Sequence, residues 1–374
     1  MIMMRKTYRA RAILVALLVI PGTPSLINSQ STWQPLGAQY SVNVVSDISL
    51  GYSGGTRTLY LAAKEDNVIV SVGGTFTWTK GLVPAPDFVT CQKDRPLVAY
   101  AGVNVRGQTM GAVLKRTSDG GQSWSLITSG IENDNAQLTC LSISSIGVLF
   151  VGADEFSSGA QQAVHVLFLS FDDGVTWNTP VFPTSGISVK RIVSDPFDPL
   201  FQYLGGVAGI NQGVWKSSDQ GNSWTQTLEA PIISLAIDRR NTNVLYAGTD
   251  ESNTRIYRST DQGSNWSSVF VLGGYRINDL AVDPATSTVY AASSRGLLKS
   301  TDGGSWTKLT SGLAEIDIRS VEVDPTTANL VYIGTPSKFY YSTDGGTTWT
   351  DASPDLVPAG GITVYNNDIY LNPA

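Results

Sequence analysis

Short stretches of alternating apolar and polar residues recur along the chain, separated by turns rich in Gly, Ser, Asn and Asp. The clearest period contains an alternating stretch at residues 276–283, followed by short runs at 289–292, 296–300 and 306–309. Alternation with a period of two is typical of a β-strand with one buried face. Each period therefore predicts four strands, and the chain is expected to be all-β.

A motif marks the turn between the third and fourth strands of each period. The pattern S/T-x-D-x-G-x-x-W occupies residues 117–124, 170–177, 217–224, 259–266 and 342–349, a shortened copy lies at 300–306, and a copy at 71–78 lacks the Asp and Gly. From Trp78 onward the tryptophans of the motif are 46, 53, 47, 42, 40 and 43 residues apart, the length of one propeller blade.

The residue types of this motif indicate a structural role. The Asp carboxylate can accept backbone N–H bonds across its own turn, the Gly supplies a positive φ, and the Trp can pack between sheets. We therefore predict that the motif stabilises the fold and has no catalytic role. The residues concerned are Asp119, Trp124, Asp172, Trp177, Asp219, Trp224, Asp261, Trp266, Asp302, Trp306, Asp344 and Trp349.

These copies resemble the Asp-box, or BNR, repeats of a β-propeller superfamily that includes sialidases, sortilin-type receptor domains, two-propeller xyloglucanases and Ycf48-type assembly factors. The resemblance implies Asp-box hairpins between the third and fourth strands, on the face away from the ligand. Seven repeats fit between residues 42 and 352. The segments 33–36, 362–364 and 368–371 resemble spare strands, so a propeller of seven or eight blades is expected, with eight slightly favoured.

The N-terminus has the pattern of a signal peptide. Arg5, Lys6, Arg9 and Arg11 precede an apolar run at 12–20 that is too short to span a bilayer. We predict a signal peptide at 1–29 and a single propeller domain at 30–374, exported to the periplasm or cell envelope or secreted, without stable membrane insertion after cleavage. An uncleaved anchor is the alternative.

Charge and composition limit the classes of partner that the chain can bind. Charged residues make up only 15% of the chain. Removing residues 1–29 takes away four cations and leaves 21 basic and 31 acidic residues, a formal charge of −10. A body this acidic disfavours binding to nucleic acid.

Few residues are suited to catalysis or to holding a metal. His165 is the one histidine, and it lies in an alternating strand, which favours a packed side chain over a general base. Cys91 and Cys140 are expected to be buried thiols, with a disulfide as the alternative. One histidine and two separate cysteines cannot form a zinc site, so no metal or other cofactor is predicted. Carboxylates in the loops at 154–159 and 250–253 leave calcium as a weaker alternative to plain polar loops.

Glycoside hydrolysis needs only two suitably placed carboxylates. The sialidase resemblance would imply an Arg-Ile-Pro motif, which the chain lacks. Asp195, Asp238, Asp283 and Asp324 recur at one repeat position, which favours a role in turns. The sequence therefore favours binding over catalysis.

Departures from the repeat indicate a ligand-binding region at one mouth of the central channel. The candidate residues lie at or just before the first strands of the fourth, sixth and seventh repeats, and they are Lys190, Arg191, Arg276, Asp279 and Arg319. Such cations can bind an anionic peptide or sugar, whereas solvated charges paired with Asp279, Asp317 and Glu315 are the alternative. We expect an exported, non-catalytic binding or assembly scaffold for a protein or glycan partner, the alternative being a glycoside hydrolase with an unrecognised carboxylate pair.

Overall fold

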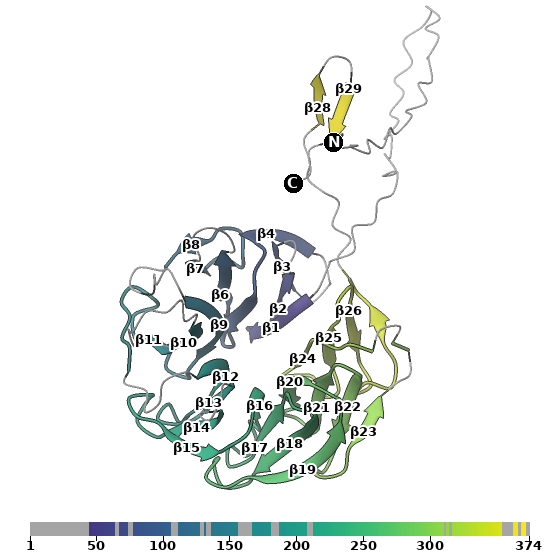
Figure 1. Ribbon diagram of the computed structural model, residues 1–374. Coiled ribbons are helices and arrows are strands. Elements are labelled where there is room, and N and C mark those ends of the chain that lie inside the picture. Colours follow the sequence, from purple (N-terminus) through teal and green to yellow (C-terminus); the bar gives the residue numbers. More distant parts are fainter. Residues whose placement is uncertain are drawn as a thin grey trace, which may run out of the picture. The chain divides into compact units, whose positions relative to one another are not determined.

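The computed structural model forms a ring of seven antiparallel sheets, one after another along the chain. It describes residues 45–63, 67–73, 78–105, 111–127, 131, 136–155, 167–180, 187–207, 212–309, 312–313, 316–353, 362–365 and 368–371. Figure 1 shows the sheets placed as blades around a central axis, with the first strand of each blade innermost. The predicted all-β propeller is confirmed.

Six of the blades have four strands. The first contains β1 (Val45–Ser53), β2 (Thr56–Ala63), β3 (Asn67–Val72) and β4 (Trp78–Pro84). The second contains β5 (Phe88–Gln92), β6 (Arg95–Val105), β7 (Gly111–Thr117) and β8 (Ser125–Leu126). The third has only β9 (Ala136–Ile143), β10 (Leu149–Glu155) and β11 (Leu167–Ser170), and an isolated bridge from Leu169 to Asn178 stands in place of its fourth strand.

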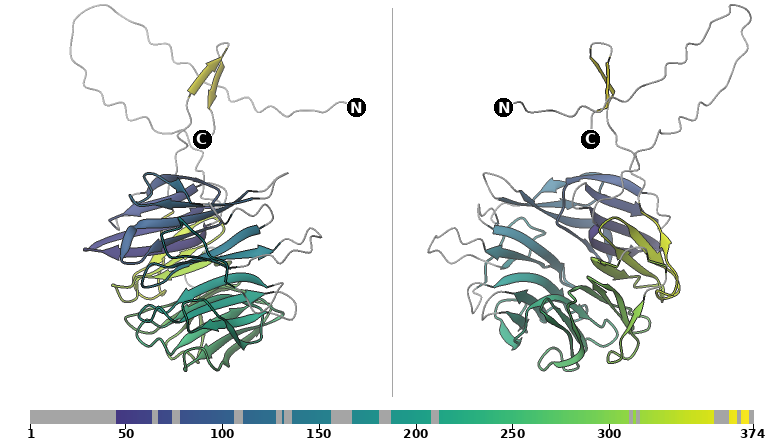
Figure 2. Two further views of the ribbon diagram at one scale, coloured as in Figure 1. Left: turned by 90° about the vertical axis from the view of Figure 1, so that its left-hand side faces the viewer. Right: turned by 45° about the vertical axis from the view of Figure 1, so that its right-hand side comes forward.

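The remaining blades follow the same order from the axis outward (Figure 1), and Figure 2 shows the blades from two other sides. The fourth contains β12 (Ser188–Ser194), β13 (Gln202–Val207), β14 (Gly213–Ser217) and β15 (Thr225–Leu228). The fifth contains β16 (Ile232–Ile237), β17 (Leu245–Thr249), β18 (Asn253–Ser259) and β19 (Ser267–Gly273). The sixth contains β20 (Ile277–Val282), β21 (Val289–Ser293), β22 (Gly296–Ser300) and β23 (Thr307–Leu309). The seventh contains β24 (Ser320–Val323), β25 (Val331–Gly334), β26 (Phe339–Ser342) and β27 (Thr350–Asp351).

The Asp-boxes of the second blade and of the fourth to seventh blades form the predicted hairpins between the third and fourth strands. In the third blade the motif leads to the bridge at Asn178 instead. In the fourth blade, Asp219 Oδ1 accepts the Ser223 backbone N–H at 2.8 Å, and the Ser217 hydroxyl donates to the same oxygen at 2.8 Å. Gly221 has a φ of +84°, and a Cβ there would lie 2.6 Å from the Phe150 ring. Only glycine fits this position, because both the backbone conformation and the neighbouring blade exclude a side chain.

The Asp-box tryptophans pack against the preceding blade. Trp224, 6% exposed, joins a cluster with Phe150 and Leu169 of the third blade, and its indole N–H donates to the Gly221 carbonyl at 2.9 Å. Trp266 similarly packs with Tyr203 and Val214 of the fourth blade. The hydrophobic core is therefore divided into clusters between successive blades, and the motif connects neighbours.

The ring closes directly between its first and seventh blades. Val45, Leu50 and Leu61 pack with Tyr332 and Phe339 in one buried cluster. The Val45 N–H donates to the Thr335 carbonyl at 3.2 Å, and Arg57 Nε lies 2.6 Å from Asp324 Oδ2.

The slight preference for eight blades is wrong. Strands β28 (Ile362–Tyr365) and β29 (Asp368–Leu371) form a two-stranded sheet that, within the described residues, pairs with no blade. The proposed partner strand at 33–36 and the signal peptide at 1–29 lie outside the described residues. Within the described residues, β1 packs directly on β24, so no eighth sheet stands between the first and seventh blades.

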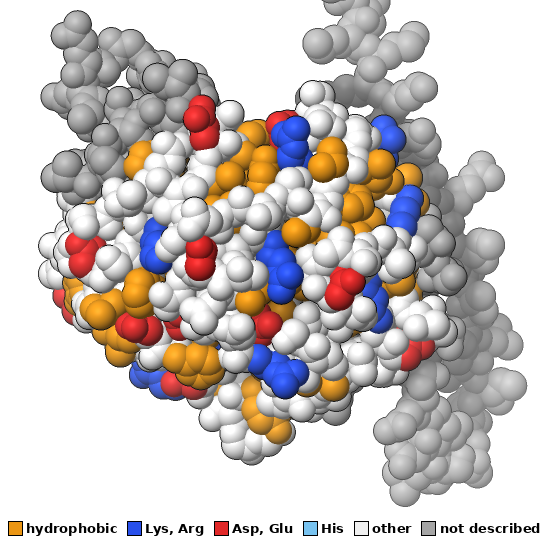
Figure 3. All heavy atoms as spheres, turned by 90° about the horizontal axis from the view of Figure 1, so that it is seen from below, with side chains coloured by type: hydrophobic (Ala, Val, Ile, Leu, Met, Phe, Trp, Pro, Cys, Tyr) orange, Lys and Arg blue, Asp and Glu red, His pale blue; other side chains and the backbone are white. Residues whose placement is uncertain are grey.

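The outer side of the ring carries mixed charge. Figure 3 shows the side seen from below in Figure 1, where cations and carboxylates are interspersed with hydrophobic side chains.

Within the described residues, no helix is long and apolar enough to cross a membrane.

Candidate functional site

The first strands of the blades surround a central channel with two hollow sections. The wide section is a cavity of about 600 Å³, and the narrow section has about 110 Å³. Asp47, Thr90, Leu141 and Arg191 line both sections. These four residues therefore mark the constriction between them.

The narrow section gathers most of the site predicted from the sequence. Lys190, Arg191, Asp279 and Arg319 all line it, whereas Arg276 does not. Whether these residues bind a ligand stays a prediction.

Every cation of that predicted site has a carboxylate partner. Lys190 lies 2.8 Å from Asp154, Arg191 lies 3.3 Å from Asp279, Arg276 lies 3.5 Å from Asp250, and Arg319 lies 2.6 Å from Asp317. The pairs of Arg191 and Arg319 are among those expected under the alternative of paired charges. The third carboxylate named under that alternative, Glu315, lies outside the described residues.

The constriction contains a group of interacting charges. Burial raises the pKa of Asp47 to about 7, although the Arg191 guanidinium opposes this shift. Burial also raises the pKa of Asp279, again against the influence of Arg191. The pKa of Arg191 is raised, chiefly by Asp279, so Arg191 remains a cation and separates the two sections.

Both carboxylates also connect neighbouring blades. Asp47 Oδ2 accepts the Val89 N–H at 3.1 Å, and Asp279 Oδ2 accepts the Val321 N–H at 3.2 Å. Their other oxygens accept the N–H groups of Ile48 and Leu280, each at 3.0 Å. All four carboxylate oxygens are thus engaged by the backbone, which favours a role in holding the blades over a role as catalytic pair.

The wide section opens where the first strands end. Each blade contributes one residue to a ring around this mouth. These residues are Tyr52, Lys93, Ser145, Pro196, Arg239, Pro284 and Pro325.

This mouth lies on the face that carries the Asp-boxes. The N–H of Gly120, in an Asp-box, donates to the carbonyl of Leu97, just beyond the first turn of its blade, at 3.0 Å. Gln220 donates to Leu200 in the same way at 3.0 Å. The family resemblance implied that a ligand binds on the face away from the Asp-boxes. The wide section opens instead on the face that carries them.

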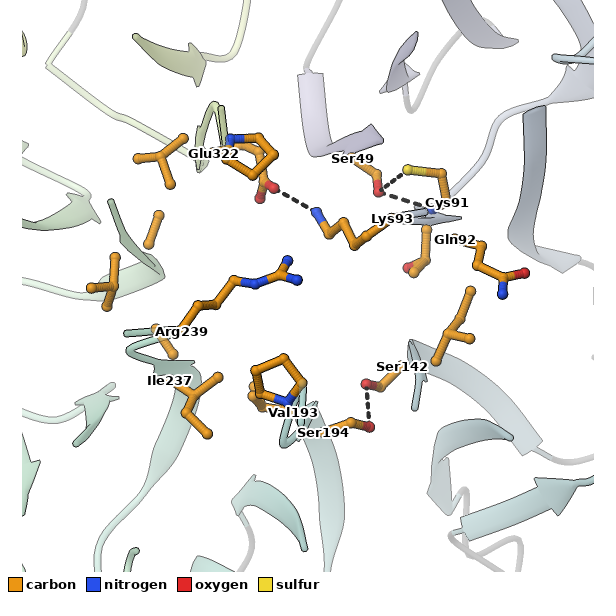
Figure 4. A pocket seen from close by; sticks show the side chains of 18 of the residues that line it. Ser49, Cys91, Gln92, Lys93, Ser142, Val193, Ser194, Ile237, Arg239 and Glu322 are labelled. Carbon is orange, nitrogen blue, oxygen red and sulfur yellow. Dashed lines mark hydrogen bonds and ion pairs between the residues drawn. The ribbon is translucent and has the colours of Figure 1, made fainter. Parts of the chain in front are cut away.

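Three charged side chains meet inside the wide section. Lys93 Nζ lies 2.5 Å from Glu322 Oε1. Burial in the channel works against the charged form of Lys93, but Glu322 outweighs it, and the pKa of Lys93 is raised. Arg239 points into the same space from another blade (Figure 4). Its positive charge acts to lower the pKa of Lys93, so the two cations interact.

A further sequence signal would have identified Arg239. The recurring aspartates Asp195, Asp283 and Asp324 are each followed by proline, whereas Asp238 is followed by Arg239. The structure confirms these aspartates as turn-formers; for example, Asp238 Oδ1 accepts the Arg240 N–H at 2.8 Å. Arg239 follows its aspartate, whereas the predicted candidates precede theirs, so the prediction from sequence did not include Arg239.

The structure describes some of the remaining candidate residues and leaves out others. Cys91 and Cys140 are buried free thiols, so the alternative of a disulfide is wrong. In the part of the chain that the structure describes, no cluster of His, Cys, Asp and Glu is suited to a metal. Asp250 and Glu251 pair with Arg276 and Arg255 instead. His165 and residues 156–159 lie outside the described residues.

Comparison with known proteins supports the fold. Residues 211–370 match a family model described as the DUF6242 beta propeller domain. The GH74 xyloglucanase from Xanthomonas campestris has a TM-score of 0.68 at 14% identity, over 86% of this chain and 56% of that chain. PorZ, a surface component of the type-IX secretion system of Porphyromonas gingivalis, has a TM-score of 0.59 at 16% identity, over 80% of this chain and 46% of that chain.

A structure of YCF48 bound to D1 peptide has a TM-score of 0.51 at 17% identity, covering 75% of this chain and 87% of that chain. The chain spans about half the length of the xyloglucanase and PorZ chains. At these identities the likeness shows the fold alone: this chain is a β-propeller, and its own hairpins carry the Asp-box motif.

Proposed function

We propose that the protein is an exported, non-catalytic binding or assembly scaffold that holds a segment of a partner in the wide section of its channel. The observation that carries this proposal is the cavity of about 600 Å³ with a mouth built from all seven blades. Cavities of this size suit a ligand of several hundred cubic ångströms. The N-terminal pattern at residues 5–20 supports export.

The lining favours a peptide over a glycan. Ile143, Ile192, Ile237 and Val323 supply aliphatic surface, and Tyr52 is the one aromatic side chain among the lining residues that the structure describes. Aliphatic walls suit the side chains of a peptide, whereas sugar rings usually pack on aromatic rings. The YCF48 structure with its D1 peptide supports a peptide-binding role for a propeller of this type.

Filling the cavity tests this function. Ser194 lines the wide section and bonds to the Ser142 hydroxyl at 3.1 Å, so Ser194→Trp should block the space. We expect that Ser194→Trp no longer captures the partner that the wild-type protein captures from host extract. Quantitative mass spectrometry measures this capture. Ser267→Trp, on the exposed outer strand β19, is the matched control and should retain capture.

Two further outcomes distinguish the alternatives. Loss of capture in Arg276→Glu/Arg319→Glu, with Ser194→Trp unaffected, would move the binding site to the narrow mouth. Turnover of chromogenic glycosides that disappears in Asp47→Asn or Asp279→Asn would favour the hydrolase instead, because burial raises the pKa of both carboxyl groups. Melting temperatures close to that of the wild type establish that each variant is folded.

A further inference from the structure

We propose that Arg239 forms a carboxylate-binding subsite in the wide section of the channel, which selects peptide segments that carry an acidic group. This inference rests on the proposed function, and it adds the chemistry of the partner and the residue that recognises it.

Arg239 differs from the other cations of the channel because its guanidinium has no partner among the residues that the structure describes. Lys93 is paired with Glu322, and Arg191 is paired with Asp279. Arg239 makes no hydrogen bond or ion pair with any residue that the structure describes. Figure 4 shows its side chain extending into the cavity, where Lys93 and Glu322 also meet.

The carboxylates of the lining leave Arg239 without an ion pair. Glu322 pairs with Lys93. Asp47 and Asp195 accept backbone N–H groups, and Asp94, which is exposed, forms no ion pair with Arg239 among the described residues. A planar guanidinium can bind a carboxylate through two parallel hydrogen bonds. A ligand carboxylate would thus provide the missing partner.

The fold itself does not require arginine at this position. Asp195 and Asp324 form the same turn as Asp238, each accepting the N–H two residues later at 2.9 and 2.8 Å, and proline follows both of them. Proline suits this position because it fixes the backbone angle that such a turn needs. Arg239→Pro therefore reproduces the sister repeats, and it removes the charged side chain together with one backbone N–H.

Three synthetic heptapeptides of one aliphatic sequence provide the probes, studied by isothermal titration calorimetry. The first, Gly-Leu-Val-Glu-Val-Leu-Gly with an amidated C-terminus, carries a single carboxylate on its side chain. The second replaces Glu with Gln, and the third is the Gln peptide with a free C-terminal carboxylate. The third peptide distinguishes a chain terminus from an acidic side chain as the source of the carboxylate.

We expect the Glu peptide to bind the wild type roughly tenfold more tightly than the amidated Gln peptide. This preference should disappear in Arg239→Ala and in Arg239→Pro. Arg240→Ala is the matched control, because Arg240 is the adjacent cation but is exposed and lies outside the cavity lining; it should keep the preference. If the Gln peptide with a free C-terminus binds more tightly than the Glu peptide, the end of the chain is the preferred source of the carboxylate.

Equal affinities for the three peptides, or a preference that survives in Arg239→Ala, would overturn the subsite. If peptide binding is equal but is lost in Ser194→Trp, the cavity still binds peptides and only the carboxylate subsite is wrong. The subsite is also overturned if the wild type binds none of the peptides. In that case the proposed function is tested separately, by whether Ser194→Trp abolishes partner capture.

Discussion

Trp224 and Asp219 stabilise one hairpin through different interactions. Trp224 fills space against Phe150 and Leu169 of the preceding blade, whereas Asp219 holds the N–H of Ser223 at 2.8 Å within its own turn. The tryptophan therefore connects blades, and the aspartate maintains the local conformation that presents it.

This difference predicts unequal costs of truncation. Trp224→Ala should lower the free energy of unfolding by about 3 to 5 kcal/mol, because it leaves a large cavity between blades. Asp219→Ala should lower it by about 1 to 2 kcal/mol, because turn N–H groups lose their acceptor. Denaturant unfolding measures both values. Small and equal losses would contradict a structural role for the motif.

Asp47 should make stability depend on pH. Its pKa is raised from 3.8 to about 7 by burial, so the folded state favours the protonated form more than the unfolded state does. This contribution to stability is complete below about pH 4 and is lost as the pH rises through about 7. We expect Asp47→Asn to be less sensitive than the wild type to a rise from pH 5 to pH 8, measured by denaturant unfolding.

Asp87→Asn provides the control for that comparison. Asp87 lies on the same narrow section and its Oδ2 accepts the Asn104 N–H at 2.9 Å. Asparagine keeps an oxygen that can accept this hydrogen bond, and the substitution leaves Asp47 in place. The fall in stability that Asp47 causes between pH 5 and pH 8 should therefore persist in Asp87→Asn. Parallel pH profiles for the wild type and Asp47→Asn would show that Asp47 does not titrate in this range.

At the scale of elements, the hairpins were predictable because their determinants are local. Asp, Gly and Trp at fixed spacing specify a turn, and the repeat places that turn between the third and fourth strands. The fourth strand of the third blade is reduced to the bridge from Leu169 to Asn178. The motif at 170–177 resembles the other copies, so this reduction could not be predicted from it.

The first strands were harder to interpret because their side chains meet across the ring. The structure places Lys190, Arg191 and Arg319 on the narrow section and leaves Arg276 outside its lining. It also adds the carboxylate partner of each of these cations. The volume of each section depends on contacts between blades far apart in sequence. For that reason the sequence did not indicate that Lys93 of the second blade would meet Glu322 of the seventh.

At the scale of the whole molecule, closure turns a linear set of repeats into a ring. Each blade packs mainly on its neighbours, so the joint between the first and last blades limits the stability of the ring. Phe339 is fully buried in that joint beside Tyr332 and Leu50. A salt bridge crosses the same joint, with Arg57 Nε 2.6 Å from Asp324 Oδ2.

Two variants test whether this joint is sufficient by itself. Deleting residues 362–374 should leave the denaturant midpoint nearly unchanged, because β28 and β29 pair with each other and with no blade among the described residues. Phe339→Ala should lower the free energy of unfolding by about 3 to 5 kcal/mol, because it opens a cavity in the closing cluster. A deletion as damaging as Phe339→Ala would mean that the C-terminal hairpin takes part in closure. Losses near zero for both would place the weakest joint elsewhere in the ring.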